Sequence, residues 1–386
     1  MKIAHVGLDL VPSSGGSVVS IRDFSQVSNS VVISFTQPAK LRNECSAIDG
    51  TVHIEVSSGF WGRAFAWAPE KNRCLALDSL NDVDLIVCHV LLRYHVHWVK
   101  VASRQLRIPY WVVPHGCLDP YVFSYRSMIK KVWFNLYGRR FLTKAARVIF
   151  ATEKEKLKAS KYYCEDNTNV IHWPVQPIDV SCGEKVRDRI RNRLQIGEED
   201  KILIYLGRLH PMKRPIETII AFGHAGTTRT HLMIVGPDEE ISLDDCKTIV
   251  QEYGINNIHL IGPIYGDEKN DYLLASDAYI SLSHRENFGY TTAEALSAGL
   301  PVILSPGNDL ADELVSLDCG WMLKDNLAET AALAIREFSS LSLVRLQEMG
   351  QRGRNWALKH LDFKTFSNKV LLAASESLTH DKDHVD

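Results

Sequence analysis

Short apolar runs alternate with stretches of helical periodicity along most of the chain. In the first half, the runs are bounded by polar or turn-forming residues, as is typical of buried strands. They lie at residues 2–8, 31–35, 84–89, 110–113 and 147–151. Segments in which apolar residues recur every three or four positions separate them. This alternation predicts a parallel sheet with helices on both faces.

The same pattern repeats in the second half. It begins with a strand-like run at 201–206, and the runs in HLMIVGPD, IHLIGPI and 278–282 follow. Between the halves, Pro174 and Pro177 interrupt the pattern, so we predict an inter-domain hinge near Pro174. Helical patterns at 325–338, 341–360 and 363–378 end the chain. The sequence therefore predicts an α/β protein with domains at 1–174 and 175–362 and a last helix over 363–378.

Composition narrows the class of protein. The 386 residues suffice for two domains, and 45% hydrophobic with 23% charged residues is typical of a soluble globular protein. A net charge of -2 argues against a nucleic-acid partner. The eight cysteines occur singly and the chain opens directly into a strand-like run, so we expect reduced thiols and a cytoplasmic location. No apolar run approaches the roughly 18 to 20 residues of a membrane span.

The stretch HRENFGYTTAEALSAGLPVILS carries the most specific chemistry. A predicted strand, the loop ENFG with Gly289, and a predicted helix at 290–297 place backbone N–H groups and the positive end of a helix dipole together, which suits a phosphate. Glu286 and Glu294 bracket this point. Glu294 could accept hydrogen bonds from ribose hydroxyls and Glu286 from a sugar. Spacing alone fits equally well a solvated loop Glu and an ordinary helix Glu.

The segment ENFGYTTAEALSAGLPVI resembles the signature of glycosyltransferase family 4, a retaining family with the GT-B fold. The resemblance implies that Glu286 contacts the donor sugar and Glu294 the ribose of its nucleotide. It also implies that the rest of the loop binds the donor, through Asn287, Phe288, Gly289 and Tyr290.

Two loops in the first half agree with this resemblance. Gly15 and Gly16 follow the first strand, and the helix after them, at 17–24, should take Ser17 or Gly16 as its N-cap. The spacing is not that of a dinucleotide fingerprint. In the family such a GG loop lies near the donor diphosphate and the acceptor. The alternative is a flexible turn.

His115, in PHGCLDP, follows a predicted strand and resembles the family's PHG histidine, which contacts the donor sugar. A purely structural histidine is the alternative.

The second half carries the matching cations. Gly207, Arg208 and Lys213 follow the strand at 201–206 and resemble the family's GR…K motif, whose Arg and Lys hold the donor diphosphate. Gly236 and Gly262 also follow strands. In the family, loops at their positions line the nucleobase pocket through backbone contacts.

We expect neither a metal nor another cofactor. The sequence Asp82-Val83-Asp84 matches an Asp-x-Asp metal motif, but it precedes its strand and is interpreted as a solvated turn. His89, His95 and His97 have no Cys or carboxylate at ligand spacing, so they are interpreted as scattered helix and strand-end histidines and not as a metal cluster.

The segment 126–147 is basic and aromatic. Its apolar residues Ile129, Val132, Trp133 and Leu136 fall at helical spacing, which predicts an amphipathic helix. Two interpretations stay open. The helix lies on an anionic membrane surface, or its apolar stripe packs on the sheet and its charges are solvated.

These patterns and the resemblance lead to one functional expectation. The chain should be a retaining, metal-independent hexosyltransferase that uses a UDP- or GDP-linked sugar donor. Its N-terminal domain should bind the acceptor, a growing lipid-linked bacterial surface glycan of the lipopolysaccharide or exopolysaccharide type, with the enzyme peripheral on the inner face of the cell membrane. A C-terminal helix should cross back to the N-terminal domain. The alternatives are a soluble acceptor, an epimerase of the same fold, and a non-catalytic sugar-nucleotide binding protein.

Overall fold

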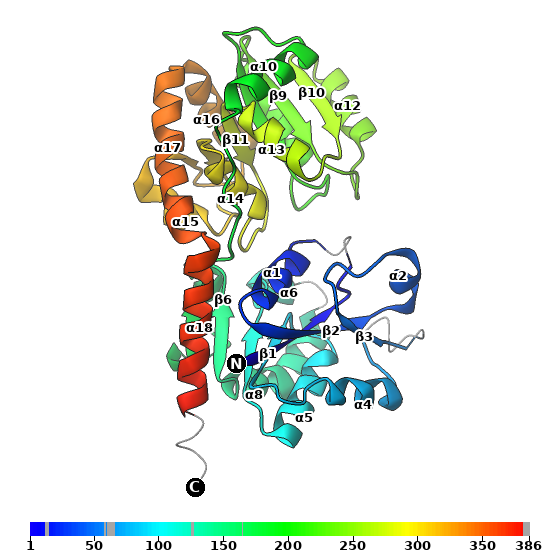
Figure 1. Ribbon diagram of the computed structural model, residues 1–386. Coiled ribbons are helices and arrows are strands. Elements are labelled where there is room, and N and C mark those ends of the chain that lie inside the picture. Colours follow the sequence, from blue (N-terminus) through cyan, green and yellow to red (C-terminus); the bar gives the residue numbers. More distant parts are fainter. Residues whose placement is uncertain (12–14, 58, 60–65, 125–126, 164, 381–386) are drawn as a thin grey trace. The chain divides into compact units, whose positions relative to one another are not determined.

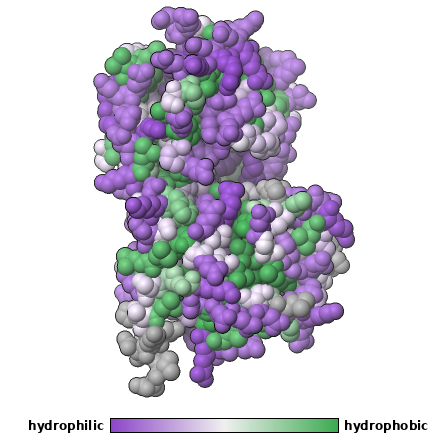
Figure 2. All heavy atoms as spheres, in the orientation of Figure 1, coloured by the Kyte–Doolittle hydropathy of each residue, from purple (hydrophilic) through white to green (hydrophobic). Residues whose placement is uncertain are grey.

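The computed structural model describes residues 1–386 except 12–14, 58, 60–65, 125–126, 164 and 381–386 (Figure 1). The chain divides into two compact units. One comprises residues 1–174 together with the C-terminal segment from Lys364, and the other comprises residues 175–363. On the face shown in Figure 2, hydrophobic side chains gather in patches on the first unit among hydrophilic ones. No helix among the described residues is both long and apolar enough to span a bilayer.

The first unit contains a seven-stranded parallel sheet in the order β3-β2-β1-β4-β5-β6-β7. Its strands are β1 Lys2–Leu8, β2 Asn29–Thr36, β3 Val52–Glu55, β4 Leu85–His89, β5 Tyr110–Val113, β6 Arg147–Phe150 and β7 Thr168–Val170. Its helices are α1 Gly16–Ser25, α2 Pro38–Asn43, α4 Glu70–Asp78, α5 His95–Leu106, α6 Pro120–Ser124, α7 Ser127–Trp133, the π-helix η2 Phe134–Gly138, α8 Arg139–Thr143, α9 Glu153–Ala159, η3 Glu165–Asn167 and α18 Phe363–His380.

The last helix, α18, packs on the first unit. The indole Nε1 of Trp111 in β5 donates a hydrogen bond of 3.0 Å to Ser377 Oγ, and both residues are buried. Phe366 meets Phe24 of α1 edge to face, with ring centroids 4.9 Å apart. Figure 1 shows α18 running beside β6, where Arg147 forms an ion pair with Glu376 at 3.1 Å. The C-terminal segment is therefore part of the first unit's core.

The second unit contains a six-stranded parallel sheet in the order β10-β9-β8-β11-β12-β13. Its strands are β8 Lys201–Leu206, β9 Thr230–Val235, β10 Ile258–Gly262, β11 Ala278–Ser281, β12 Val302–Leu304 and β13 Gly320–Met322. Its helices are α10 Gly183–Leu194, α11 Pro215–Ala225, α12 Leu243–Glu252, α13 Asp267–Leu274, α14 Tyr290–Ser297, α15 Ala311–Leu314, η4 Val315–Leu317, α16 Ala328–Ser340 and α17 Leu343–His360.

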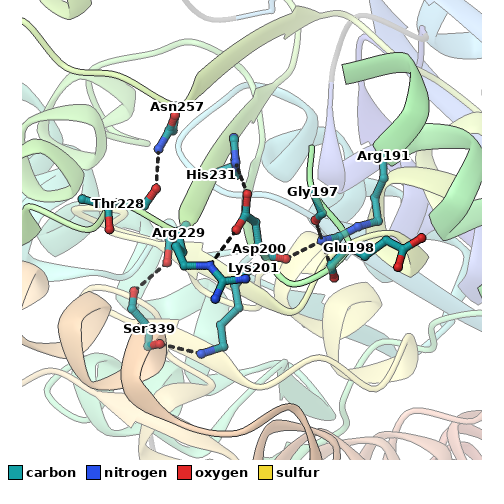
Figure 3. A network of polar contacts seen from close by, with 11 residues as sticks. Arg191, Gly197, Glu198, Asp200, Lys201, Thr228, Arg229, His231, Asn257 and Ser339 are labelled. Carbon is teal, nitrogen blue, oxygen red and sulfur yellow. Dashed lines mark hydrogen bonds and ion pairs between the residues drawn. The ribbon is translucent and has the colours of Figure 1, made fainter. Parts of the chain in front are cut away.

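A polar network closes the amino-terminal edge of this second sheet (Figure 3). Arg191 of α10 donates to the backbone carbonyls of Gly197, Glu198 and Asp200, so it fixes the turn before β8. The Asp200 carboxylate accepts from Arg229 Nε at 3.1 Å, just before β9. These contacts hold the strand starts in register, and they lie at the opposite edge from the loops that follow the strands.

The expected strands and parallel sheets are confirmed, but several boundaries differ. The N-cap of α1 is Gly15, not Gly16 or Ser17, with φ of 78°, which favours glycine. The first helix after β13 begins at Ala328 instead of 325, because Asp325 accepts a hydrogen bond from the Leu327 N–H and forms a turn. Four short strands, β3, β7, β12 and β13, were not predicted.

Candidate active site

The loops that follow β8, β9 and β10 are joined through their backbones. The N–H of Gly207 donates to Val235 O at 3.0 Å, and the N–H of Gly236 donates to Gly262 O at 2.9 Å. A Cβ on Gly236 would lie 1.8 Å from Gly207 O, so only glycine fits there. The three glycines singled out in the sequence thus lie together at the carboxyl edge of the second sheet.

The ENFG loop is held against the segment that follows β12. The Glu286 N–H donates to Gly307 O, and the Asp309 N–H donates to Glu286 O, both at 2.8 Å. A Cβ on Gly307 would lie 2.2 Å from Ser283 O, so this close approach requires glycine. Gly289, with φ of 77°, is the N-cap of α14, whose first turn has no acidic residue and no side-chain cap. The start of α14 therefore suits an anion.

Two of the predicted site residues contact each other directly. Lys213 Nζ, from the loop after β8, donates to Glu286 Oε2, and both side chains are about four-fifths buried at 21% and 18% exposure. The His284 N–H donates to Met212 O at 2.8 Å, which ties the two loops together. The alternative of a solvated loop Glu is therefore wrong for Glu286.

Arg208 lies on the same loop but has a different partner. Its guanidinium pairs with Glu239, which follows β9, and its side chain is half exposed. The Tyr205 hydroxyl donates to Arg208 O at 2.9 Å and holds the backbone in place. Sequence reasoning missed Glu239, because no motif marks the segment that supplies it.

Glu294 lies in the second turn of α14 and is also paired. Lys269 Nζ of α13 donates to Glu294 Oε1 at 2.6 Å. The other oxygen, Oε2, is buried and finds no hydrogen-bond partner among the described residues. Lys269 was missed as well, since it lies 25 positions before Glu294 and outside the signature. The unpartnered oxygen is an acceptor position that a ligand hydroxyl would satisfy.

The other residues of the ENFG loop differ in how far their side chains are exposed to solvent. Phe288 is 2% exposed, and its ring meets Tyr290 edge to face with centroids 5.1 Å apart, so its side chain supports the loop. Asn287 is half-buried.

In the first unit, Gly15 and Gly16 begin α1, and residues 12–14 of the same loop lie outside the described residues. His115, half-buried with φ of 50°, follows β5 in the predicted PHG loop. The buried Glu155 carboxylate fixes this loop by accepting from the N–H of Gly116 at 2.6 Å and of Ala151 at 2.8 Å.

His115 ends a row of histidines within the first unit. Its Nε2 lies 3.0 Å from His89 Nδ1, and His89 Nε2 lies 3.2 Å from His5 Nδ1. On the other side, His115 Nδ1 lies 3.5 Å from Ser20 Oγ of α1. Burial lowers the pKa of His5 and of His115 to about 3, so this row is neutral near pH 7. His89 ends β4, and His95 and His97 lie in α5, so all three are strand-end and helix histidines as predicted. The contacts of His89 within the row were not predicted.

The Asp-x-Asp sequence does form a turn before its strand, as predicted. Asp82 has φ of 62°, and Asp84 Oδ2 accepts from the Lys2 N–H at 2.7 Å. Among the described residues, no three His, Cys, Asp or Glu side chains form a group that could hold a metal.

The basic segment is divided between core and surface, and its residue Arg126 lies outside the described residues. Phe134 and Phe141 are buried, and Trp133 packs against the same core. Val132 and Leu136 are 51% and 75% exposed. Part of the apolar stripe therefore packs on the core of the first unit, and part of it is exposed.

Comparisons with known proteins agree with this architecture. A model described as "Glycosyl transferases group 1" matches residues 186–356, and one described as "Glycosyltransferase Family 4" matches residues 29–177. The GDP-mannose:cellobiosyl-diphosphopolyprenol alpha-mannosyltransferase of Xanthomonas campestris is 23% identical over 320 residues, 79% of this chain and 78% of that protein. The N-acetyl-alpha-D-glucosaminyl L-malate synthase of Bacillus anthracis is 24% identical over 199 residues, 50% of this chain and 49% of that protein.

The fold has counterparts of nearly full length. The structure of Anabaena Alr3699/HepE in complex with UDP superimposes with a TM-score of 0.79 at 18% identity, and covers 97% of this chain and 100% of that one. The chain belongs to the group 1 and family 4 glycosyltransferases and has the GT-B fold of two Rossmann-like domains.

Proposed function

We propose that the protein is a retaining, metal-independent hexosyltransferase that moves a hexose from a UDP- or GDP-linked donor to a lipid-linked bacterial surface glycan. The observation that carries the proposal is the second unit's arrangement of Lys213, Glu286 and Glu294 around the start of α14. A cation, an anion-binding helix start and an unpartnered carboxylate oxygen match the diphosphate and ribose of a nucleotide sugar.

The nucleotide would bind through Glu294. Lys269 holds Oε1, and the buried Oε2 would accept from a ribose hydroxyl. The N–H groups at the start of α14 would receive a phosphate, while the joined glycine loops at Gly236 and Gly262 would border the base through their backbones. UDP is bound in the similar Anabaena structure, and the Xanthomonas relative is named for GDP-mannose.

The transfer step would proceed on one face of the sugar. The bond between the anomeric carbon and the phosphate oxygen breaks, the acceptor oxygen bonds to the same face, and the departing phosphate oxygen takes the acceptor's proton. Arg208 and Lys213 would stabilise the charge that grows on that phosphate. Asp119, the carboxylate of the PHGCLDP loop, pairs with Lys158 at 3.1 Å and accepts from the Tyr121 N–H. This engagement argues against Asp119 as a covalent nucleophile.

The first unit is assigned to the acceptor. We give His115, Gly15 and Gly16 the roles that the family resemblance implies: the donor sugar for His115, and the diphosphate and acceptor for the glycines. The exposed Met128, Val132 and Leu136 recur every four residues beside the exposed cations Lys131 and Arg139. An apolar stripe with flanking cations favours an anionic membrane surface, and thus a cytoplasmic enzyme that is peripheral on the inner membrane.

A direct assay tests the proposal. The purified protein is incubated with UDP- or GDP-linked hexoses, with and without a lipid-linked glycan extract, and NMR reads the anomeric configuration of the product. We expect turnover that requires the acceptor, survives EDTA and retains the configuration. Release of a free altered sugar without acceptor would indicate an epimerase. The relatives compared are glycosyltransferases and a synthase, so we do not propose that activity.

A further inference from the structure

The first unit contains an aromatic cavity that the proposed reaction does not use. It has a volume of about 380 Å³, within the usual range for small-molecule sites. Its walls are almost entirely apolar. They come from the segment just before α4, from α5 and the segment just before it, and from the α7 and η2 helices. The lining includes Trp67, Leu92, Tyr94, Trp133, Leu136 and Tyr137.

An irregular helix builds one wall of the cavity. The chain forms a π-helix at Phe134–Gly138, which supplies Leu136 and Tyr137 to the lining. A Cβ on Gly138 would lie 2.8 Å from the Trp133 ring, so the wall depends on glycine at this position. Single π-helical turns within α-helices recur at functional sites.

Both tyrosine hydroxyls of the wall are already engaged within the protein, and Arg93 and His97 complete the lining. The Tyr94 hydroxyl accepts from Arg73 at 2.8 Å, and the Tyr137 hydroxyl lies 3.3 Å from His97 Nδ1. What these rings turn toward the cavity is their apolar carbon surface. A ligand for such a cavity is a hydrocarbon, because a polar group would lose its water without gaining a partner.

One cation adjoins the same wall, and three more lie near it. Lys100 Nζ lies 4.4 Å from the centre of the Tyr137 ring. Burial and three neighbouring cations, Arg104, Lys144 and Arg140, lower the pKa of Lys100. Across the described part of the chain, none of these four cations forms an ion pair with an acidic residue. An anionic group is the complement of such a cluster.

We propose that the cavity and the four cations form one binding site for a lipid phosphate. The hydrocarbon chain enters the aromatic cavity, and the phosphate contacts the cluster around Lys100. Tyr137 belongs to both parts, since its ring lines the cavity and carries Lys100 on its face. In the ligand, the phosphate must therefore be attached close to the start of the hydrocarbon chain, as in a prenyl phosphate or diphosphate. This site would bind the lipid that carries the glycan acceptor. The inference therefore rests on the proposed function and deepens it.

Binding of a short soluble analogue tests the site. Calorimetry compares farnesyl diphosphate, inorganic diphosphate and farnesol on the full-length protein. We expect one farnesyl diphosphate per chain, bound at least tenfold more tightly than either control, because only this ligand satisfies both parts of the site. If inorganic diphosphate binds as tightly as farnesyl diphosphate, the cavity does not contribute to binding. If farnesol binds as tightly as farnesyl diphosphate, the cations do not contribute.

Matched variants locate the binding. Lys100→Gln removes the central cation. Leu136→Glu places a charge at the cavity wall, and because the Leu136 side chain is exposed, this substitution should leave the protein folded. Each should weaken farnesyl diphosphate binding at least tenfold. Lys161→Gln and Leu157→Glu change exposed residues of the first unit outside the cavity, and should change binding less than twofold. Controls as harmful as the site variants would overturn the proposal.

The outcome separates this inference from the proposed function. If the protein transfers sugar and binds UDP or GDP but not farnesyl diphosphate, the lipid site is wrong and the glycosyltransferase proposal stands. If it binds farnesyl diphosphate as expected but transfers no hexose from any nucleotide sugar, the lipid site stands and the proposed reaction fails.

Discussion

His89 Nδ1 lies 3.0 Å from His115 Nε2, and this contact connects the PHG loop to the interior of the first sheet. The proton positions along the row follow from its two ends. The Ser20 hydroxyl donates to Ser17 O at 2.9 Å, so its oxygen accepts from His115 Nδ1–H. Nε2 of His115 then accepts from His89, which in turn accepts from His5. At the far end, His5 Nε2 is buried with no partner among the described residues, as suits a nitrogen without a proton.

The row predicts that His115 is held in its Nδ1–H form. Nitrogen NMR of the histidine side chains should show this form in the wild type at pH 7. His89→Phe should release it, because free imidazole prefers the other tautomer, and should lower turnover more than it weakens nucleotide binding. His97→Phe, which changes a histidine outside the row, should leave the His115 signal unchanged. An unaltered His115 signal in His89→Phe would contradict the directional row.

The same burial predicts loss of stability in acid. The pKa of His5 and His115 falls to about 3 and that of His95 to about 4 in the folded protein, from 6.5. Below pH 6.5 the unfolded chain binds protons that the folded chain does not, so stability falls with pH by up to about 1.4 kcal/mol per unit for each histidine. Asp23, whose pKa burial raises to about 7, acts in the opposite direction between pH 4 and 7. Burial also lowers the pKa of His89, so four buried histidines act against this one acid. Thermal unfolding should therefore occur at a lower temperature at pH 5 than at pH 7. His5→Phe should reduce this difference, and an unchanged difference would contradict the assignment.

Glu294 and Lys269 give a prediction on nucleotide affinity. Glu294→Ala should weaken binding of UDP or GDP by more than tenfold, since charge-assisted hydrogen bonds contribute about 1.5 to 3 kcal/mol. Lys269→Met should weaken it less, because the carboxylate stays but loses the cation that positions it. Glu268→Ala alters an exposed acid of α13, the helix that carries Lys269, and is the control. Calorimetry measures all three, and unchanged affinity in Glu294→Ala would remove the ribose assignment.

The sequence predicted those parts of the site that follow directly from a strand. Gly236 and Gly262 were found because a strand followed by glycine is a local pattern. Lys269 and Glu239 could not be found this way, since each lies in a different element from its partner and chain folding alone brings them together. His5 was missed for another reason: it sits within an apolar strand, where periodicity indicates only that the position is buried.

The exposed apolar stripe gives a prediction on membrane binding. Charge reversal at Lys131, Arg139 and Arg140 should release the protein from anionic liposomes, because each basic residue near such a surface contributes roughly 1 kcal/mol. Lys130 is left unchanged, since its Nζ donates to Val122 O at 2.8 Å and supports the fold. Sedimentation at low salt measures binding, and circular dichroism checks folding. Reversal of Lys247, an exposed cation of the second unit, is the control. A wild type that stays in solution would refute membrane attachment.

The cations of the second unit give a prediction on catalysis. Arg208→Ala and Lys213→Ala should lower kcat more than they weaken donor binding, because both would act on charge that develops as the phosphate departs. Lys213→Ala should be the more severe of the two. Its removal leaves the largely buried Glu286 carboxylate unpaired beside the diphosphate, whereas Arg208 is half exposed.

The double variant Lys213→Ala with Glu286→Gln separates the two effects. If repulsion by the unpaired carboxylate causes part of the loss, the double variant should bind the donor better than Lys213→Ala alone while turnover stays low. Steady-state kinetics and calorimetry on the same preparations measure both quantities, with Arg229→Ala, an exposed cation at the amino-terminal edge of the sheet, as the control. The product should keep the donor's anomeric configuration in every active variant. An inverted product, or a sugar trapped covalently on Asp119 or Glu286 and detected by mass spectrometry, would overturn the same-face mechanism, because neither is formed when the departing phosphate itself takes the acceptor's proton.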